Sequence, residues 1–269
     1  MNRSMASRPA RVFAATIVTL TALGLAALVW REIDARQSHY TDGDTIKAPY
    51  GRSQPADILW APPTPHPDPI NDLGEEYEPR ISPDGRTLVF VRGRAGENAE
   101  LWMSERLARG WSEPAPLDAV NSASDELGPS FAFDGETLYF YSDRDGGSGG
   151  YDIWATTRGA DGWREPVNLG PGVNSRFNDY GPAPTPDGDA LYFSSNRPRD
   201  GEPVAEQAEW PATLREERSR RDYDLYVSAL TPGGAADAVP LTELNTDSDE
   251  GAPAVSPFGD FIYFASDRP

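Results

Sequence analysis

Four segments of the chain share one pattern of hydrophobic and polar positions. In each, a glycine is followed by an aliphatic residue three positions later, phenylalanine at five and arginine at nine. Positions two apart project from the same face of a strand, so the pattern predicts a strand with one buried face in every copy. The segments are SPDGRTLVFVRGR (82–94), AFDGETLYFYSDR (132–144), TPDGDALYFSSNR (185–197) and SPFGDFIYFASDR (256–268), with phenylalanines Phe90, Phe140, Phe193 and Phe264 and arginines Arg94, Arg144, Arg197 and Arg268.

Further strands flank these segments. The Asp-Gly pair before each aliphatic position suits a tight hairpin turn, although Phe258 replaces the aspartate in the last copy. A triplet of acidic, aliphatic and aromatic residues follows the arginine at 100–102, 152–154 and 224–226 and predicts a third strand. Trp-x-Glu-Pro motifs at 111–114 and 163–166 precede a predicted fourth. Each unit therefore reads as four short antiparallel strands.

The units recur at the spacing expected of propeller blades. Their turn glycines lie 50, 53 and 71 residues apart, and the long interval reflects an insertion at 199–221. A repeat of about 40–50 residues with four strands is typical of a β-propeller blade. We expect an all-β β-propeller of about four blades in this chain, either as a complete ring or as part of a larger one.

At these residues the sequence resembles the TolB-type, WD-repeat-like β-propeller family. The shared features are the S-P-D-G-x-x-L-x-F segments and the Asp-Ile-Trp and Asp-Leu-Tyr strands, and the resemblance covers about residues 75–269. It implies an exported propeller that contacts other envelope proteins or polymers, and it supplies no catalytic motif.

The N-terminal residues carry a predicted membrane anchor. Residues 12–30 form an uncharged apolar run of 19, close to the ~20 residues that span a bilayer as a helix. Three arginines precede the run, which favours a cytoplasmic N-terminus (1–11) and export of the remainder. We expect a single-pass signal-anchor in the cytoplasmic (inner) membrane, a Pro/Gly-rich spacer at 31–76 and a periplasmic propeller at 77–269. A cleaved signal peptide is the alternative.

The last unit contains only its first two strands before Pro269. Two segments of the spacer, Asp57–Trp60 and Pro69–Asp72, resemble the third and fourth strands of a unit. They are candidates to complete the last blade and close the ring, and a ring with additional blades is the other reading.

The net charge and the missing catalytic motifs narrow the classes of function that the sequence supports. Residues 1–37 hold 5 basic and 2 acidic side chains of the 24 and 43 in the chain, which leaves −22 for residues 38–269. This charge disfavours nucleic acid as a partner. There is no cysteine, the two histidines (His39 and His66) lie in the spacer, and no P-loop, nucleophile elbow or H-E-x-x-H motif is present.

We therefore expect no enzyme activity and no cofactor. The predicted function is a membrane-tethered module that binds an envelope protein or polysaccharide. The alternative is a propeller that serves as the platform or gate of a longer enzyme.

Two features are candidates for binding. Acidic residues recur before the first strand of each unit and could form a rim of carboxylates; the alternative is that they cap loops or pair with the repeated arginines. The insertion, with Trp210 and Arg215, is the other candidate. No metal site is expected: Asp143 and Asp145 alternate as in a calcium-binding loop, but the closing glutamate of an EF-hand is absent. The acidic candidates are Asp125, Glu126, Asp179, Asp249 and Glu250.

Overall fold

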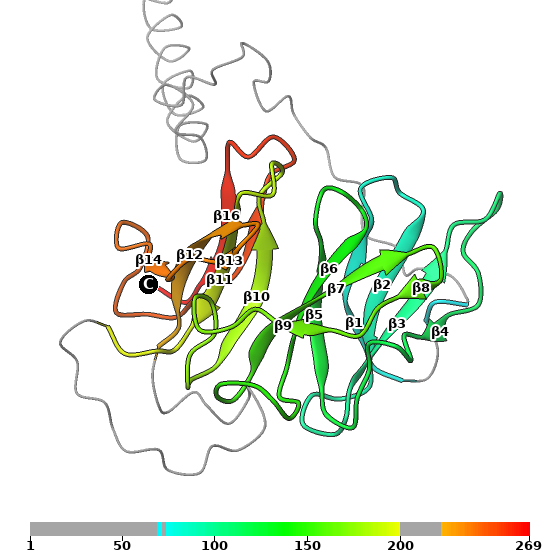
Figure 1. The fold of residues 1–269 in the computed structure, drawn as a ribbon, viewed down its shortest axis with the longest axis horizontal. Coiled ribbons are helices and arrows are strands. Elements are labelled where there is room, and N and C mark those ends of the chain that lie inside the picture. The colour runs from blue at the N-terminus through cyan, green and yellow to red at the C-terminus, as the bar shows by residue number, and fades with distance from the viewer. Residues whose placement is uncertain (1–68, 72–73, 200–221) are drawn as a thin grey trace, which may run out of the picture. The chain divides into compact units, whose positions relative to one another are not determined.

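The computed structural model describes residues 69–71, 74–199 and 222–269 (Figure 1). Every regular element within them is a β-strand, which confirms the all-β prediction for this part of the chain. The predicted anchor at 12–30 and most of the insertion lie outside the described residues. Within the described ranges, no helix is long and apolar enough to cross a membrane.

The strands form four antiparallel sheets, which we number as blades 1 to 4 along the chain. Blade 1 contains β1 (Glu76–Ile81), β2 (Thr87–Arg92), β3 (Glu100–Glu105) and β4 (Ala115–Pro116). Blade 2 contains β5 (Glu126–Phe131), β6 (Thr137–Ser142), β7 (Asp152–Gly159), β8 (Gly162–Trp163) and β9 (Val167–Asn168). Blade 3 contains β10 (Asp179–Pro184), β11 (Ala190–Ser195), β12 (Asp224–Thr231), β13 (Gly234–Ala235) and β14 (Val239–Pro240), and blade 4 contains β15 (Glu250–Val255) and β16 (Ile262–Ser266).

Blades 1 to 3 share one topology. The first strand pairs with the second, the second with the third, and a two-residue fourth strand (β4, β9 or β14) pairs with the third. In blades 2 and 3 the third strand also ends in a small hairpin with β8 or β13. An isolated bridge between Arg106 and Trp111 takes the place of this hairpin in blade 1. The predicted unit of four short antiparallel strands is thus present three times.

The predicted hairpin turns join the first two strands of every blade. Gly85, Gly135, Gly188 and Gly259 have φ of 72°, 70°, 77° and 72°, the left-handed region that favours glycine. The last turn forms although Phe258 replaces the aspartate, because the Gly259 N–H donates to the Ser256 carbonyl as in the other copies.

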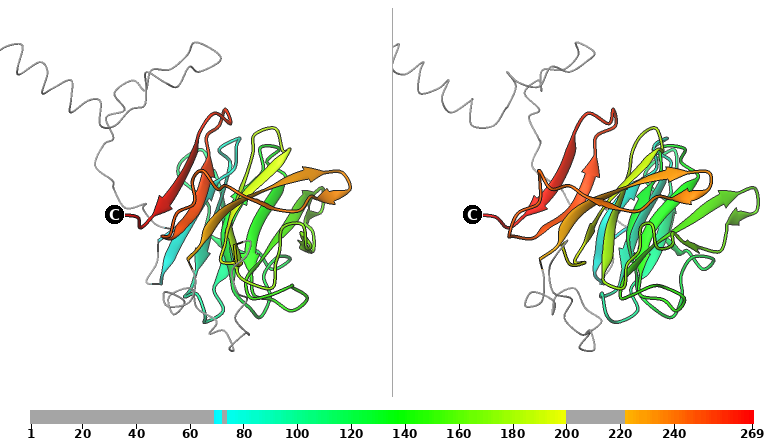
Figure 2. Two further views of the ribbon diagram at one scale, coloured as in Figure 1. Left: turned by 90° about the vertical axis from the view of Figure 1, so that its left-hand side faces the viewer. Right: turned by 60° about the vertical axis from the view of Figure 1, so that its left-hand side comes forward.

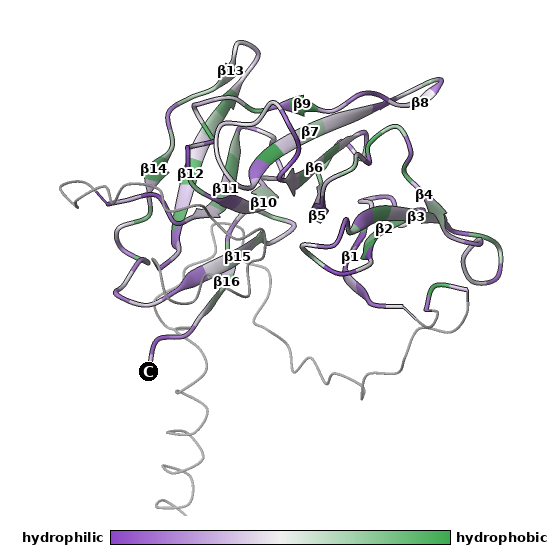
Figure 3. Cartoon of the chain, turned by 90° about the horizontal axis from the view of Figure 1, so that it is seen from below, coloured by the Kyte–Doolittle hydropathy of each residue, from purple (hydrophilic) through white to green (hydrophobic). Residues whose placement is uncertain are grey.

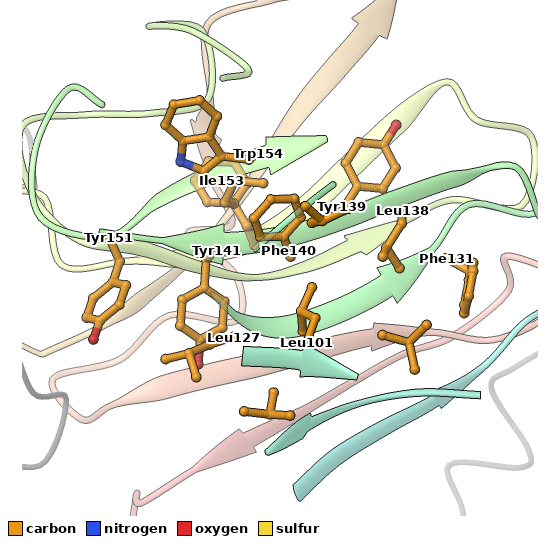
Figure 4. Close-up of a cluster of buried hydrophobic side chains, with 14 of the residues drawn as sticks. Leu101, Leu127, Phe131, Leu138, Tyr139, Phe140, Tyr141, Tyr151, Ile153 and Trp154 are labelled. Carbon is orange, nitrogen blue, oxygen red and sulfur yellow. The ribbon is translucent and has the colours of Figure 1, made fainter. Parts of the chain in front are cut away.

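The predicted phenylalanine column lies in the core. Phe90, Phe140 and Phe193 are at most 2% exposed, whereas Phe264 in the two-stranded blade 4 is only half-buried. Figure 4 shows Phe140 beside Leu138, Ile153 and other apolar side chains of the cluster. In Figure 3, parts of the long strands β7 and β12 are green, the colour of hydrophobic residues. Side chains from blades 1 to 3 form the larger hydrophobic cluster, and Leu88 and Phe90 of blade 1 belong to a second, smaller cluster.

Consecutive blades pack face to face. The first strand of each blade contacts the preceding blade: β5 lies against β1 to β3, β10 against β5 to β7, and β15 against β10 to β12. Figure 2 shows this succession, with β15 and β16 in orange-red and red at one end of it. Repeated sheets that bury one another's faces in this way are the arrangement of β-propeller blades.

Part of the predicted spacer at 31–76 contacts blade 1. β1 begins at Glu76, and Ile70, which was assigned to the spacer, is 5% exposed and packs with Leu88, Phe90 and Trp111 of blade 1. Ile70 lies six residues before the first strand, as Val120 does before β5. Residues 69–71 therefore take the place of the connector that precedes a blade. Residues 57–60, the other predicted closing segment, lie outside the described residues.

Candidate functional site

Three of the predicted rim carboxylates are buried. Glu126, Asp179 and Glu250 begin β5, β10 and β15, and each side chain is 0% exposed. Their partners belong to the repeated arginine column: Arg144 at 2.8 Å, Arg197 at 2.6 Å and Arg268 at 3.1 Å. This geometry matches the alternative given above, in which the acidic residues pair with the arginines, and differs from an open rim.

Each of these arginines donates hydrogen bonds to the first strand, the second strand and the connector that precedes its blade. In blade 2, Arg144 donates to Glu126 on the first strand, to Ser142 at the end of the second strand, and to the Val120 carbonyl in the connector. Its guanidinium also lies 5.0 Å from the centre of the Phe140 ring, a cation–π contact. The planar guanidinium, with several N–H donors, can serve all these partners at once.

Blade 3 and blade 4 repeat the arrangement. Arg197 donates to Ser195 and the Val173 carbonyl, and Arg268 donates to Ser266 and the Leu244 carbonyl. Burial raises the pKa of the Glu126 and Asp179 carboxyls, and the neighbouring hydroxyl, N–H and guanidinium groups oppose that shift. These carboxylates therefore form ion pairs and hydrogen bonds with groups inside the protein.

In blade 1 the structure corrects the predicted arginine. Arg94, which the sequence alignment placed in the column, forms an exposed pair with Glu75. Arg92 performs the repeated role instead, because it donates to Glu76 on β1 and to the Ile70 carbonyl of the connector. Arg92 occupies the strand position held by Ser142 in blade 2, since it pairs with the first residue of the first strand.

The remaining acidic candidates accept hydrogen bonds from loop residues, including loop residues of the preceding blade. Asp125, 2% exposed, accepts hydrogen bonds from the Ala99 N–H at 2.9 Å and from the Tyr151 hydroxyl at 2.8 Å. Asp249 accepts the Tyr223 N–H at 2.7 Å. Both contacts correspond to the loop-capping alternative. Each secures the residues that lead from the second strand of one blade into its third strand.

The described base of the insertion is pinned to blade 3. Arg199 makes a two-pronged contact with Asp224, at 2.7 and 2.8 Å, and a further pair with Asp247 at 3.3 Å. Asp224 is the first residue of β12 and is 2% exposed. Trp210 and Arg215 lie outside the described residues, so their part in binding stays a prediction.

Negative charge gathers beside this base. Asp222 is exposed, and its pKa is raised first by desolvation and then by the charge of Asp249. In the equivalent loop of blade 2, away from the insertion, burial raises the pKa of Asp143, whose carboxylate accepts the Asp125 N–H. In the described part of the chain, no group of three or more His, Cys, Asp or Glu could hold a metal ion. The charges of Asp249, Asp267 and Asp224 all act on Asp222, so this surface is acidic.

Sequence reasoning missed two further residues. Arg199 has no counterpart in the repeat pattern, and only its position at the start of the insertion could have suggested an anchoring role. Glu78 has a φ of 50° at the β-bulge of β1, where blades 2 and 3 have Gly128 and Gly181. Its carboxylate accepts the Gly128 N–H at 2.7 Å and lies 3.3 Å from the Tyr141 hydroxyl, and burial raises its pKa.

Comparisons with known proteins give similar solved structures only. No family model matches the chain, and no curated protein matches it. A structure assigned as TolB from Agrobacterium tumefaciens is 22% identical and covers 74% of this chain and 60% of its own, with a TM-score of 0.47. TolB from Acinetobacter baumannii is 15% identical and covers 70% of this chain and 42% of its own, with a TM-score of 0.39.

A third similar structure is an enzyme. A puromycin hydrolase is 18% identical and covers 75% of this chain and 30% of its own, with a TM-score of 0.40. The chain thus spans less than two thirds of each of these structures. Solved structures similar to this chain include TolB proteins, the family that its repeated segments resemble.

Proposed function

We propose that this protein is a non-enzymatic interaction module of the cell envelope. In this proposal, residues 12–30 anchor it in the inner membrane and the propeller is exported. Its recognition surface is the loop surface that includes the insertion at 199–221, and its partner is an envelope protein or polysaccharide. The charge of −22 on residues 38–269 favours partners other than nucleic acid.

The observation that carries the proposal is that residues on both sides of the insertion are hydrogen-bonded to the propeller. On one side Arg199 grips Asp224 with two hydrogen bonds, and on the other the Tyr223 N–H donates to Asp249. Asp249 leads directly into Glu250, which is tied to Arg268. A segment whose two flanks are fixed on a packed scaffold is well placed to present binding residues, because ordering the base before binding lowers the entropy cost.

The fold does not itself separate a binding module from the platform of an enzyme, since propellers host unrelated functions. We expect a photo-crosslinking amino acid at position 210 of the full-length protein, expressed in its native cells, to give one discrete adduct. The same group at position 167, where Val167 is 67% exposed on β9, is the matched position outside the insertion. Purified adduct partner should then bind the purified full chain.

Loosening the base should weaken this binding. Arg199→Ala removes the anchor, and we expect at least a fivefold loss of affinity for the purified partner with little change in the far-UV spectrum. Arg158→Ala is the matched control, because Arg158 of blade 2 forms an exposed pair with Glu105 of blade 1. Equal adducts at positions 210 and 167, or equal losses in the two arginine variants, would contradict the proposal.

A further inference from the structure

Blade 2 contains a buried carboxylate with one unpaired oxygen. Asp152, the first residue of β7, is 0% exposed. Its Oδ2 accepts hydrogen bonds from the Ser148 N–H at 2.6 Å and from the Asn168 side-chain N–H at 2.7 Å. Its Oδ1 is also buried and has no hydrogen-bond partner among the described residues. Burial raises the pKa of Asp152, and the charge of Asp179 adds to this shift.

A second buried polar group without a partner lies on the same face. Trp154 is two positions further along β7, so its side chain projects from the same side of the strand as Asp152. It is 7% exposed, and within the described ranges its indole N–H meets no acceptor (Figure 4). Buried polar groups in folded proteins almost always have partners. This face of β7 therefore presents an acceptor and a donor that suit a polar ligand.

The equivalent carboxylate in blade 3 shows which group fits. Asp152 is opposite Ser142 and Asp224 is opposite Ser195, and these serines are the last residues of the second strands. Asp224 is 2% exposed, so it is buried as well. Both of its oxygens accept hydrogen bonds from the guanidinium of Arg199, at 2.7 and 2.8 Å. A guanidinium thus neutralises the carboxylate of blade 3.

The residue that supplies this guanidinium is replaced by glycine in blade 2. Arg199 lies two residues after Arg197 of the repeated arginine column. Two residues after Arg144, the same column places Gly146. Blade 2 therefore keeps the buried carboxylate of Asp152 but has no side chain at the position of the blade 3 cation.

The other charged groups nearby do not compensate for this change. In blade 1 the equivalent residue, Glu100, is only half-buried, so water can solvate its carboxylate. In blade 2, Arg144 and Arg158 form their ion pairs with Glu126 and Glu105. A buried carboxylate without a cation is unfavourable, so a cation from outside the chain would stabilise blade 2.

The loop above the carboxylate has little side-chain bulk. Residues 145–150 are Asp-Gly-Gly-Ser-Gly-Gly, and 145–149 are exposed. A Cβ at Gly147 would lie 2.9 Å from Asp152 Oδ2, and a Cβ at Gly146 would lie 3.8 Å from the Trp154 ring, so the loop backbone lies directly on both side chains. Glycine-rich backbone has wide conformational freedom, which lets this loop lift to admit a small planar group.

We propose that Asp152 is a binding site for a guanidinium group, which donates hydrogen bonds to Oδ1 as Arg199 does to the carboxylate of Asp224. Guanidinium is favoured over ammonium because it is planar, carries several N–H donors and is more weakly hydrated. Its source is either a free guanidinium compound or the arginine of a peptide, whose backbone carbonyl could accept the Trp154 indole N–H. The site uses none of the residues that fix the insertion, so it goes beyond the proposed function.

The test titrates the full-length protein with guanidinium chloride at constant ionic strength. The readouts are the melting temperature and the ¹⁵N-indole resonance of Trp154, assigned by its loss in Trp154→Phe. We expect saturable changes with a midpoint of about 1–10 mM, the strength of a few charge-assisted hydrogen bonds and far below denaturing concentrations. Sodium and ammonium chloride should shift the Trp154 resonance at least fivefold less.

A second titration identifies the source of the group. N-acetyl-arginine methylamide carries both the guanidinium and a backbone carbonyl, and its lysine analogue is the control. Tighter binding of the arginine compound than of guanidinium supports an arginine of a peptide as the ligand. Tighter binding of guanidinium supports a free guanidinium compound.

Two variants locate the binding. Asp152→Asn removes the charge, while its amide oxygen can still accept from Ser148 and Asn168, and we expect at least a tenfold loss of guanidinium affinity. Asp145→Asn removes the same charge from an exposed position of the same loop and should change affinity less than twofold. The comparison of guanidinium with sodium uses the unaltered protein, so it stands even if Asp152→Asn does not fold.

Arg199→Ala is the positive control. It leaves the buried Asp224 without its guanidinium, and free guanidinium should partly restore the melting temperature of this variant. The response shows that the assay detects a guanidinium bound to a buried carboxylate of this fold.

Three results would overturn the proposal. The first is an equal effect of guanidinium and sodium on the Trp154 resonance, and the second is equal affinity of the Asp152→Asn and Asp145→Asn variants. The third is rescue of Arg199→Ala by guanidinium with no response of Trp154 in the unaltered protein. None of these results bears on crosslinking at position 210, so a failure here is distinguishable from a failure of the proposed function.

Discussion

Truncation of Arg144 should destabilise the protein far more than its position in a loop would suggest, because its side chain is only 12% exposed. Arg144→Ala removes the hydrogen bonds to Glu126, Ser142 and the Val120 carbonyl and the contact with the Phe140 ring. It also leaves the Glu126 carboxylate, 0% exposed, without its cation. Breaking a buried ion pair by removing one partner costs about 3–5 kcal/mol, and we expect a loss of unfolding free energy in that range.

Urea unfolding of the full-length protein, followed by tryptophan fluorescence and circular dichroism, measures this loss. With a denaturant slope of about 2 kcal/mol/M, the midpoint should fall by about 1.5–2.5 M. Arg94→Ala is the control, because the Arg94–Glu75 pair is about half exposed on both sides and such pairs contribute about 0–1 kcal/mol. Combining Arg144→Ala with Glu126→Gln should recover part of the loss, since the buried charge is then gone.

The result that would refute the reasoning is a loss below about 1 kcal/mol for Arg144→Ala, the range of exposed pairs. Equal losses for Arg144→Ala and Arg94→Ala would have the same meaning. Strict additivity of Arg144→Ala and Glu126→Gln would show that the two side chains do not act as a pair, since contacting residues normally couple.

Three further predictions concern the same blades and are measured by unfolding of the full chain. Arg92→Ala should cost at least about 2 kcal/mol more than Arg94→Ala, because Arg92 makes the buried tie in blade 1; the reverse order would restore the alignment read from sequence. Phe140→Ala should cost about 3–5 kcal/mol and Phe264→Ala clearly less, because Phe140 is 0% exposed and Phe264 is half-buried; similar losses would contradict this difference in packing. The raised pKa of Glu78 means that the folded state holds this proton more tightly than the unfolded chain, so unfolding free energy should fall as pH rises from about 4.3 through the folded pKa. Glu78→Gln should remove that part of the fall between pH 4 and 7, and identical pH profiles would contradict the buried position of the carboxyl.

The strands could be predicted because their signals are local. The period-two face formed by Leu138 and Phe140, the Asp-Gly turn before it and the Asp-Ile-Trp triplet after it all lie within about 25 residues. Each signal also recurs in other units. Local propensity, turn chemistry and hydrophobic pattern thus agree, which is the condition under which sequence reasoning works well.

The arginine of blade 1 could not be assigned by alignment. Arg92 and Arg94 lie only two positions apart, and a column match selects Arg94. The two arginines differ in which carboxylate and which carbonyl their guanidinium groups reach. The partners of Arg92, Glu76 and the Ile70 carbonyl, lie 16 and 22 residues earlier in the sequence. A weak signal was present, since the column that holds Ser142, Ser195 and Ser266 holds Arg92 in the first copy.

The contacts of the candidate binding residues were even harder to predict from the sequence. Recurring carboxylates such as Asp125 and Glu126 indicated equivalent positions, but the sequence does not say whether a carboxylate faces solvent or a buried guanidinium. Burial depends on the blade that packs alongside. The anchoring role of Arg199 is likewise set by contacts with Asp224 and Asp247, 25 and 48 residues away along the chain.

The sequence separation of the ties implies an order of events during synthesis. The carboxylate that begins β5 meets Arg144 only 18 residues later, and the β7 residue Ile153 is clasped by Asn174 only 21 residues later. Asp125 secures Ala99, which lies 26 residues before it. During synthesis, one blade therefore cannot complete these hydrogen bonds until the connector and the first strand of the next blade have emerged. Maturation should advance from the N-terminal blade in steps, each trailing the newest residues by roughly half a repeat, and interruption at any point leaves only the most recent unit exposed to proteases or chaperones.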